Sequence, residues 1–239
     1  MLQDTRLSRD YRKIVCDHRP AFLFGNTAPD VQTISGQERA ATHFFTIPVR
    51  DFTNPQERMF ELYCCLEQSD QLATDHVAFI AGYITHLLID QLWIKQIFQP
   101  CFSVTKNHQE MRRHLFLHNV LRVYLDRSER KQLPEDIADV ISQTQPRSWL
   151  PFVDDHHLCQ WRDFLAGQLC TKGTPLTVDV FAARMNIRPD EFEMVLGSPK
   201  LLEGEIFSRI SKNNLSKFRS RALKQSINAL RGYLSRRSR

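Results

Sequence analysis

The chain has 239 residues, of which 42% are hydrophobic and 25% are charged, and it contains only 8 glycines. These proportions are typical of a globular protein and exclude collagen-like, low-complexity and disordered chains. No run reaches the roughly 18 charge-free apolar residues that a membrane span needs. The opening residues, Met1 to Arg6, have no apolar core typical of a secretory signal. We therefore expect a cytoplasmic protein that buries a hydrophobic core.

Positive charge is concentrated at the C-terminal end of the chain. The net charge is +5, yet no acidic residue follows Glu205 and the segment beyond it carries 10 basic residues. The rest of the chain is therefore acidic. This asymmetry is compatible with a peripheral contact with an anionic membrane surface, with nucleic acid as a less favoured partner. The favoured interpretation is a solvated basic helix that lies on the acidic body.

Apolar residues recur at helical spacing along the chain. Residues 55–72 are predicted to form one helix. Residues 77–98 are predicted to form a second, which is apolar on nearly all sides and therefore buried. Pro100 is expected to end that helix. Further helices are predicted at 108–125, 134–141, 157–168, 177–186, 189–196 and 205–234, the last with a break at Asn213 and Asn214.

The predicted fold class is all-α, because no alternation of polar and apolar residues extends beyond four positions. We expect a helical core over residues 1–145 and a helical extension over residues 146–239 that ends in the basic tail. Residues 177–196 have the pattern of two short helices joined by a turn. Such a pair is more often a simple helix corner than a DNA-binding helix-turn-helix.

The six cysteines include no C-x-x-C pair, which excludes zinc-ribbon and thioredoxin-type motifs. Most have apolar neighbours, as Cys64 and Cys65 do between Tyr63 and Leu66. They are therefore predicted to be small core residues in a reducing compartment.

His86 and Asp90 interrupt the most apolar of the predicted helices. They are one turn apart, so they share a face of that helix. Polar side chains inside an apolar helix are costly unless they are paired or bind a ligand. This pair either contributes to a metal site or forms a buried His–Asp hydrogen bond.

Two other segments carry residues of the same chemical type. Asp30 follows an apolar run that stops at Gly25 and turns, so its carboxylate is either an N-cap or a placed ligand. His43 lies among apolar and aromatic residues, where it is either a core histidine or a ligand. With His86 and Asp90, these residues make a set of two imidazoles and two carboxylates, which zinc accepts.

Three short motifs carry a family resemblance. They are Gly25-x-x-Ala-Pro-Asp30, Thr42-His43-Phe44 and Gly82-Tyr-x-x-His86-x-x-x-Asp90-x-x-Trp93. Together they resemble the zinc-dependent phospholipase C family, whose architecture is shared with the S1/P1-type nucleases. The resemblance covers residues 18–126 and implies a single multi-helix domain of that type. The segment from about residue 150 is similar to the C-terminal extension of bacterial cytosolic members.

The resemblance also implies a site and an activity. Asp30, His43, His86 and Asp90 would bind a zinc ion, with two or three ions in the family's fullest sites. The implied reaction is hydrolysis of phosphate esters, in which Asp30 or Asp90 orients the nucleophile or accepts its proton.

A second zinc ion would need further ligands downstream. His114 and His118 are one turn apart and could supply them; otherwise His118 faces the core and His114 the solvent. The alternative to an enzyme is a non-catalytic helical protein with one structural or vestigial metal ion, acting through its basic C-terminal helix. A third hypothesis is a DNA-binding protein built on residues 177–196 and the tail.

Overall fold

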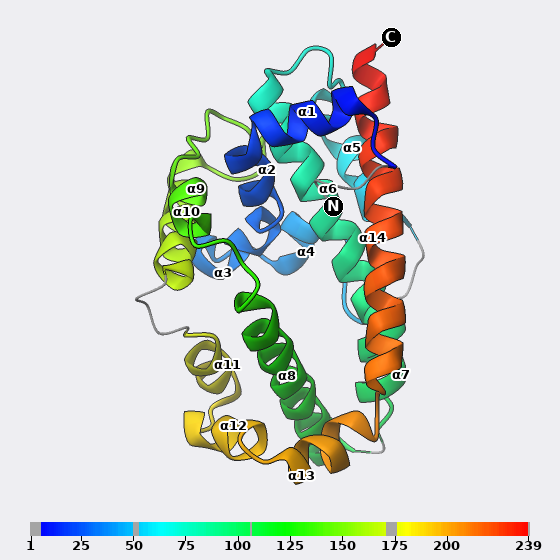
Figure 1. The fold of residues 1–239 in the computed structure, drawn as a ribbon, viewed down its shortest axis with the longest axis vertical. Coiled ribbons are helices and arrows are strands. Elements are labelled where there is room, and N and C mark those ends of the chain that lie inside the picture. The colour runs from blue at the N-terminus through cyan, green and yellow to red at the C-terminus, as the bar shows by residue number, and fades with distance from the viewer. Residues whose placement is uncertain (1–5, 50–52, 106, 171–175, 239) are drawn as a thin grey trace. The chain divides into compact units, whose positions relative to one another are not determined.

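The computed structural model describes residues 6–49, 53–105, 107–170 and 176–238. Every regular element in these ranges is a helix, which confirms the all-α prediction (Figure 1). The main α-helices are α1 (Arg9–Asp17), α2 (Arg19–Gly25), α4 (Arg39–His43), α5 (Pro55–Leu62), α6 (Thr74–Trp93), α8 (His108–Arg130), α9 (Ile137–Ser142), α10 (Asp155–Leu169), α11 (Thr177–Met185), α12 (Pro189–Leu196) and α14 (Lys212–Leu234). The remaining helical segments are η1 (Ala28–Val31), α3 (Gln32–Ser35), η2 (Cys64–Leu66), η3 (Ile94–Phe98), α7 (Gln99–Phe102), α13 (Pro199–Leu201), η4 (Leu202–Phe207) and η5 (Ser235–Ser238).

The chain divides into two compact units, each with its own hydrophobic core. Unit 1 contains the residues up to Leu92, the segment Asp136–Cys170 and the residues from Ser220 onward. Unit 2 contains Trp93–Glu135 and Thr171–Arg219. The predicted limits at residues 145 and 146 fall inside unit 1. Each unit combines segments that are distant in the sequence.

Helix α6 forms the centre of the unit 1 core. All residues from Val77 to Thr85 are buried, which explains why this helix is apolar on every side. With η3 and α7 it makes a helix of 29 residues, Thr74–Phe102, long and apolar enough to cross a membrane. About two thirds (67%) of its most apolar window is buried within the protein. A core helix passes the same test of length and composition, so the cytoplasmic location stays a prediction.

Pro100 does not end this helix, contrary to the sequence-based prediction. The π-helical turn η3 precedes it, and the Gln99 N–H donates to the Ile94 carbonyl five residues back. Pro100 lies in the first turn of α7, directly after this π-helical turn. The helix continues to Phe102.

Two other predicted helix boundaries were wrong. Helix α5 ends at Leu62, well before residue 72, because Tyr63 leaves the helical conformation at φ −137° and ψ 69°. The predicted break at Asn213 and Asn214 lies earlier. The Asn214 N–H donates to Ser211 Oγ at 3.1 Å, so both asparagines belong to the first turn of α14.

The cysteines are not core residues. Cys64 and Cys65 are exposed, and none of the other four is buried. Their apolar neighbours suggested a buried helix face, but α5 has already ended at Leu62, whose side chain is itself exposed. The helical periodicity that would have turned them inward therefore stops before it reaches them.

Helices α2 and α6 approach each other backbone to backbone in unit 1. A Cβ added to Gly25 would lie 2.0 Å from the Phe79 carbonyl oxygen, and one added to Gly82 would lie 2.2 Å from the Phe22 carbonyl oxygen. Both distances are far below van der Waals contact, so only glycine fits at either position. This close approach brings Asn26, the residue after α2, against the α6 surface one turn before His86.

The Tyr83 side chain links α6 to α4 through a hydrogen bond. Its buried hydroxyl donates to the Thr42 carbonyl oxygen at 2.6 Å, and burial raises the pKa of Tyr83 well above its ordinary value, so the hydroxyl keeps its proton. Tyr83→Phe is expected to lower the free energy of unfolding by about 1–2 kcal/mol, because the Thr42 carbonyl loses a buried partner. Urea denaturation measures this, and an unchanged midpoint would contradict it.

Candidate metal centre

Asp30 lies in η1, a helical turn between α2 and α3 that hydrogen bonds to Thr27 stabilise. The Thr27 hydroxyl donates to the Phe24 carbonyl and the Trp161 indole N–H donates to the Thr27 carbonyl, both at 2.8 Å. Neither η1 nor α3 receives a side-chain capping hydrogen bond. Asp30 is therefore not the N-cap of either helical turn, and its role as a ligand stays a prediction.

His43 is the last residue of α4 and is completely buried. Phe44 follows in the left-handed conformation at φ 61° and ends the helix. His43 Nδ1 lies 3.0 Å from the Thr42 hydroxyl, which itself donates to the Arg39 carbonyl at 3.3 Å. When the hydroxyl proton is directed to the Arg39 carbonyl, the imidazole proton is on Nδ1 and the lone pair is on Nε2, which is the tautomer that ligation through Nε2 requires.

His43 is a neutral imidazole at neutral pH. Burial lowers the pKa of His43 below its ordinary value, and the neighbouring Asp30 carboxylate opposes this only in part. Nε2 is buried and has no hydrogen-bond partner among the residues that the structure describes. A buried polar atom without a partner is costly, so this nitrogen is a natural position for a bound cation.

His86 has its ring orientation set by the backbone of the turn after α2. Its Nδ1 lies 2.8 Å from the Asn26 carbonyl oxygen. A carbonyl can only accept, so Nδ1 carries the proton and Nε2 carries the lone pair. Metal-binding histidines are commonly oriented in this way by a backbone carbonyl. The contact depends on the glycine-mediated approach of α2 and α6 described above.

Asp30, His43 and His86 form one cluster. Each offers a ligand atom, and these atoms all lie within 4.8 Å of one another. His43 Nε2 is 3.5 Å from Asp30 Oδ1, and the two imidazole rings have their centroids 5.3 Å apart. Two imidazoles and one carboxylate match a zinc site that keeps a fourth position open. The side chain of Asp30 is 42% exposed, so the cluster is reached from the Asp30 side.

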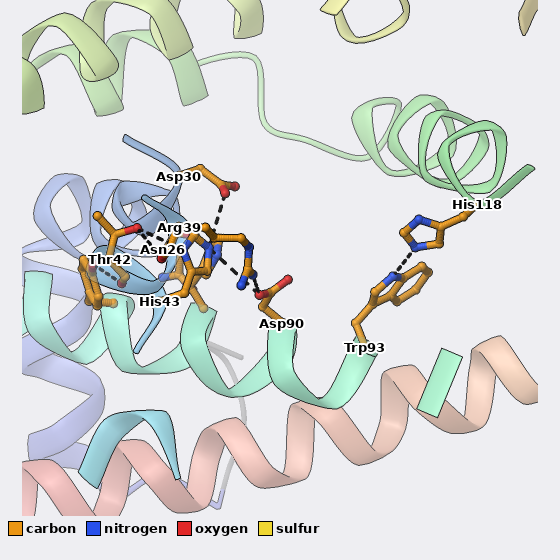
Figure 2. Close-up of polar contacts among 10 residues, drawn as sticks. Asn26, Asp30, Arg39, Thr42, His43, Asp90, Trp93 and His118 are labelled. Carbon is orange, nitrogen blue, oxygen red and sulfur yellow. Dashed lines mark hydrogen bonds and ion pairs between the residues drawn. The ribbon is translucent and has the colours of Figure 1, made fainter. Parts of the chain in front are cut away.

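Asp90 stands at the edge of this cluster. Its Oδ2 is 4.0 Å from His43 Nε2, but it forms an ion pair with the Arg39 guanidinium (Figure 2). Asp90 is therefore outside the three-residue group, and its role as a ligand stays a prediction. Figure 2 shows the Arg39 and Asp90 side chains meeting beside the imidazole of His43.

Arg39 is the functional candidate that the sequence analysis missed. It precedes His43 by one turn of α4, so the two side chains share a face. That spacing was visible in the sequence. What the sequence did not show is that Asp90, from another helix, is the partner of Arg39.

His114 and His118 are in unit 2 and join no metal-binding group among the residues that the structure describes. The Trp93 indole N–H donates to His118 Nε2 at 2.8 Å, which occupies the nitrogen that a metal would need (Figure 2). Burial lowers the pKa of His118 to about 3. His114 is also buried rather than solvent-facing. A second zinc ion on this pair stays a prediction.

The basic C-terminal segment is integrated into the fold. Arg236 pairs with Glu67 within unit 1, and Arg219 pairs with Glu129 within unit 2. The Tyr233 hydroxyl donates to the Leu66 carbonyl at 3.1 Å, and the surrounding apolar residues of α14 are buried. These contacts agree with the alternative of a basic helix lying on an acidic body. Arg239 lies outside the described residues.

No family model, curated protein or solved structure matches the chain.

Proposed function

We propose that this chain is a zinc-dependent hydrolase of phosphate esters, with the ion held by Asp30, His43 and His86. The observation that carries the proposal is the buried Nε2 of His43. Among the described residues it has no hydrogen-bond partner, and it is 3.5 Å from the Asp30 carboxylate. Two imidazoles and a carboxylate gathered at one point are a donor set that zinc accepts, and three protein ligands are typical of catalytic zinc.

The roles of the protein residues follow from their positions. Zinc bound here would supply Lewis acidity, which polarises a phosphate ester and activates water near neutral pH. The Thr42 hydroxyl and the Asn26 carbonyl hold the two imidazoles in the tautomers that ligation requires. Asp90 lies 4.0 Å from His43 Nε2, where its carboxylate would accept a proton from a water molecule activated at the centre. The partly exposed Asp30 marks the side from which a phosphate ester approaches.

Elemental analysis of the purified full-length chain tests the metal centre. We expect about one zinc ion per chain in the wild type, and loss of this ion in His86→Ala, because outer and inner ligands each change metal affinity by at least tenfold. His156→Ala is the control, since His156 is exposed and outside the cluster. A wild-type protein that binds no zinc under saturating conditions would overturn the proposal.

Hydrolysis separates the enzyme from its alternative. The zinc-loaded wild type is expected to release nitrophenol from bis(p-nitrophenyl) phosphate or from p-nitrophenyl phosphate, and His86→Ala is not. Stoichiometric zinc without hydrolysis of either ester would favour a non-catalytic protein with a structural metal ion. The pairing of Asp90 with Arg39 is the observation that keeps this alternative open. An anionic membrane as a partner of the basic tail stays a prediction.

A further inference from the structure

Arg39 places a fixed positive charge at the edge of the metal centre. Its guanidinium pairs with Asp90 Oδ2 and lies with Cζ 4.8 Å from the centre of the Phe45 ring. Both contacts restrain the guanidinium, since one is an ion pair and the other a cation–π interaction. The same Asp90 oxygen is 4.0 Å from His43 Nε2. The guanidinium and the three-ligand cluster are therefore neighbours.

The pairing affects how many ions the centre can hold. Asp90 Oδ2, the carboxylate oxygen next to the cluster, is already paired with Arg39. A second divalent ion at this carboxylate would have to displace a partly buried ion pair and stand close to a guanidinium charge, which is unfavourable. Among the described residues, no other group of ligands gathers beside this cluster. The geometry thus favours a single ion.

The guanidinium also has donor capacity that its protein contacts do not use. Its Nη1 is buried and has no hydrogen-bond partner within the described part of the chain. A buried donor without an acceptor costs free energy. The planar fork of arginine matches the oxygens of a phosphate group, and such charge-assisted pairs are among the strongest hydrogen bonds in proteins.

We propose that Arg39 takes the place of a second metal ion: the centre binds one zinc, and the Arg39 guanidinium binds the phosphate oxygens of the substrate. Asp90 is then a positioning residue, because its ion pair with Arg39 holds the guanidinium beside the cluster. This inference rests on the proposed function, because it assigns the phosphate-binding group of the same site. The inference predicts that the centre binds one metal ion and a ligand that carries a phosphate group.

Isothermal titration of the zinc-loaded full-length chain with inorganic phosphate tests the inference. Arg39→Gln is expected to retain one zinc ion per chain and to bind phosphate at least about tenfold more weakly than the wild type. Arg39→Lys keeps the charge but loses the fork, so a weakening of about threefold or more is expected. Arg58→Gln is the matched control, because Arg58 is an exposed arginine paired with Glu61, and its phosphate affinity should stay within about twofold.

The outcomes separate the inference from the function on which it rests. Absence of zinc from the wild type overturns both. Two zinc ions per wild-type chain overturn the inference alone. If Arg39→Gln retains zinc and binds phosphate as tightly as Arg58→Gln does, the inference is also overturned. Retained zinc shows that Arg39→Gln has folded; if it has lost zinc, Arg39→Lys decides, and unchanged phosphate affinity in that variant overturns the inference.

Discussion

Gly82→Ala is expected to lower the free energy of unfolding by about 3 kcal/mol or more, although alanine is normally the better helix former. The added Cβ would lie 2.2 Å from the Phe22 carbonyl oxygen and 2.9 Å from the Asn26 nitrogen. Both are backbone atoms, so neither can rotate away. Helix α2 would have to move off α6, and the Asn26 carbonyl would leave His86 Nδ1. Zinc affinity is therefore expected to fall together with stability.

Thermal and urea denaturation of the metal-free chain measure the stability of this variant. Gly167→Ala is the matched control, because Gly167 is also within a helix and an added Cβ there meets nothing within 4 Å. That variant is expected to gain about 0.5–1 kcal/mol from helix propensity. If Gly82→Ala and Gly167→Ala change stability in the same direction by similar amounts, the close approach of α2 and α6 is wrong.

Acid is expected to destabilise the protein through His118. Its pKa is about 3 in the folded chain because the ring is buried, and about 6.5 in an unfolded chain. The unfolded state therefore takes up the proton first as the pH falls. The contribution of His118 to stability is complete above pH about 6.5 and is lost progressively towards pH 3, which amounts to about 2 kcal/mol between pH 7.5 and pH 5.

Urea denaturation at pH 7.5 and at pH 5 measures this loss in the wild type and in His118→Gln. The glutamine amide oxygen can still accept from the Trp93 indole but does not titrate. The variant should lose about 2 kcal/mol less than the wild type over this range. Because the pKa of His43 and of His76 is also lowered by burial, some acid sensitivity remains. A pH dependence identical to that of an exposed-histidine control, His156→Gln, would contradict the assignment.

The all-α fold was predictable because hydrophobic periodicity is local. The positions of α6, α8, α11 and α12 follow from apolar residues at helical spacing and from the absence of strand-like alternation. The boundaries were less predictable. The π-helical turn before Pro100 and the early end of α5 depend on backbone hydrogen bonds and packing that no residue pattern specifies.

The candidate site was predictable in its residue types but not in its pairings. His86 and Asp90 stood out because polar side chains are rare in so apolar a helix. Asp30 and His43 came from a turn and from an apolar context. The structure groups Asp30, His43 and His86, whereas Asp90 turns to Arg39. Helix α4 brings the Arg39 guanidinium to the site, and Asp90 pairs with it.

By itself, the sequence determined that the chain is helical and that α6 is buried, and it identified Asp30, His43 and His86 as candidate ligands. Each of these follows from local spacing and composition. The tertiary structure decided which groups meet. Gly25 and Gly82 let two backbones touch, and this contact places the Asn26 carbonyl on His86 and leaves its Nε2 lone pair available. Contacts between distant segments depend on packing in three dimensions, which local periodicity does not encode.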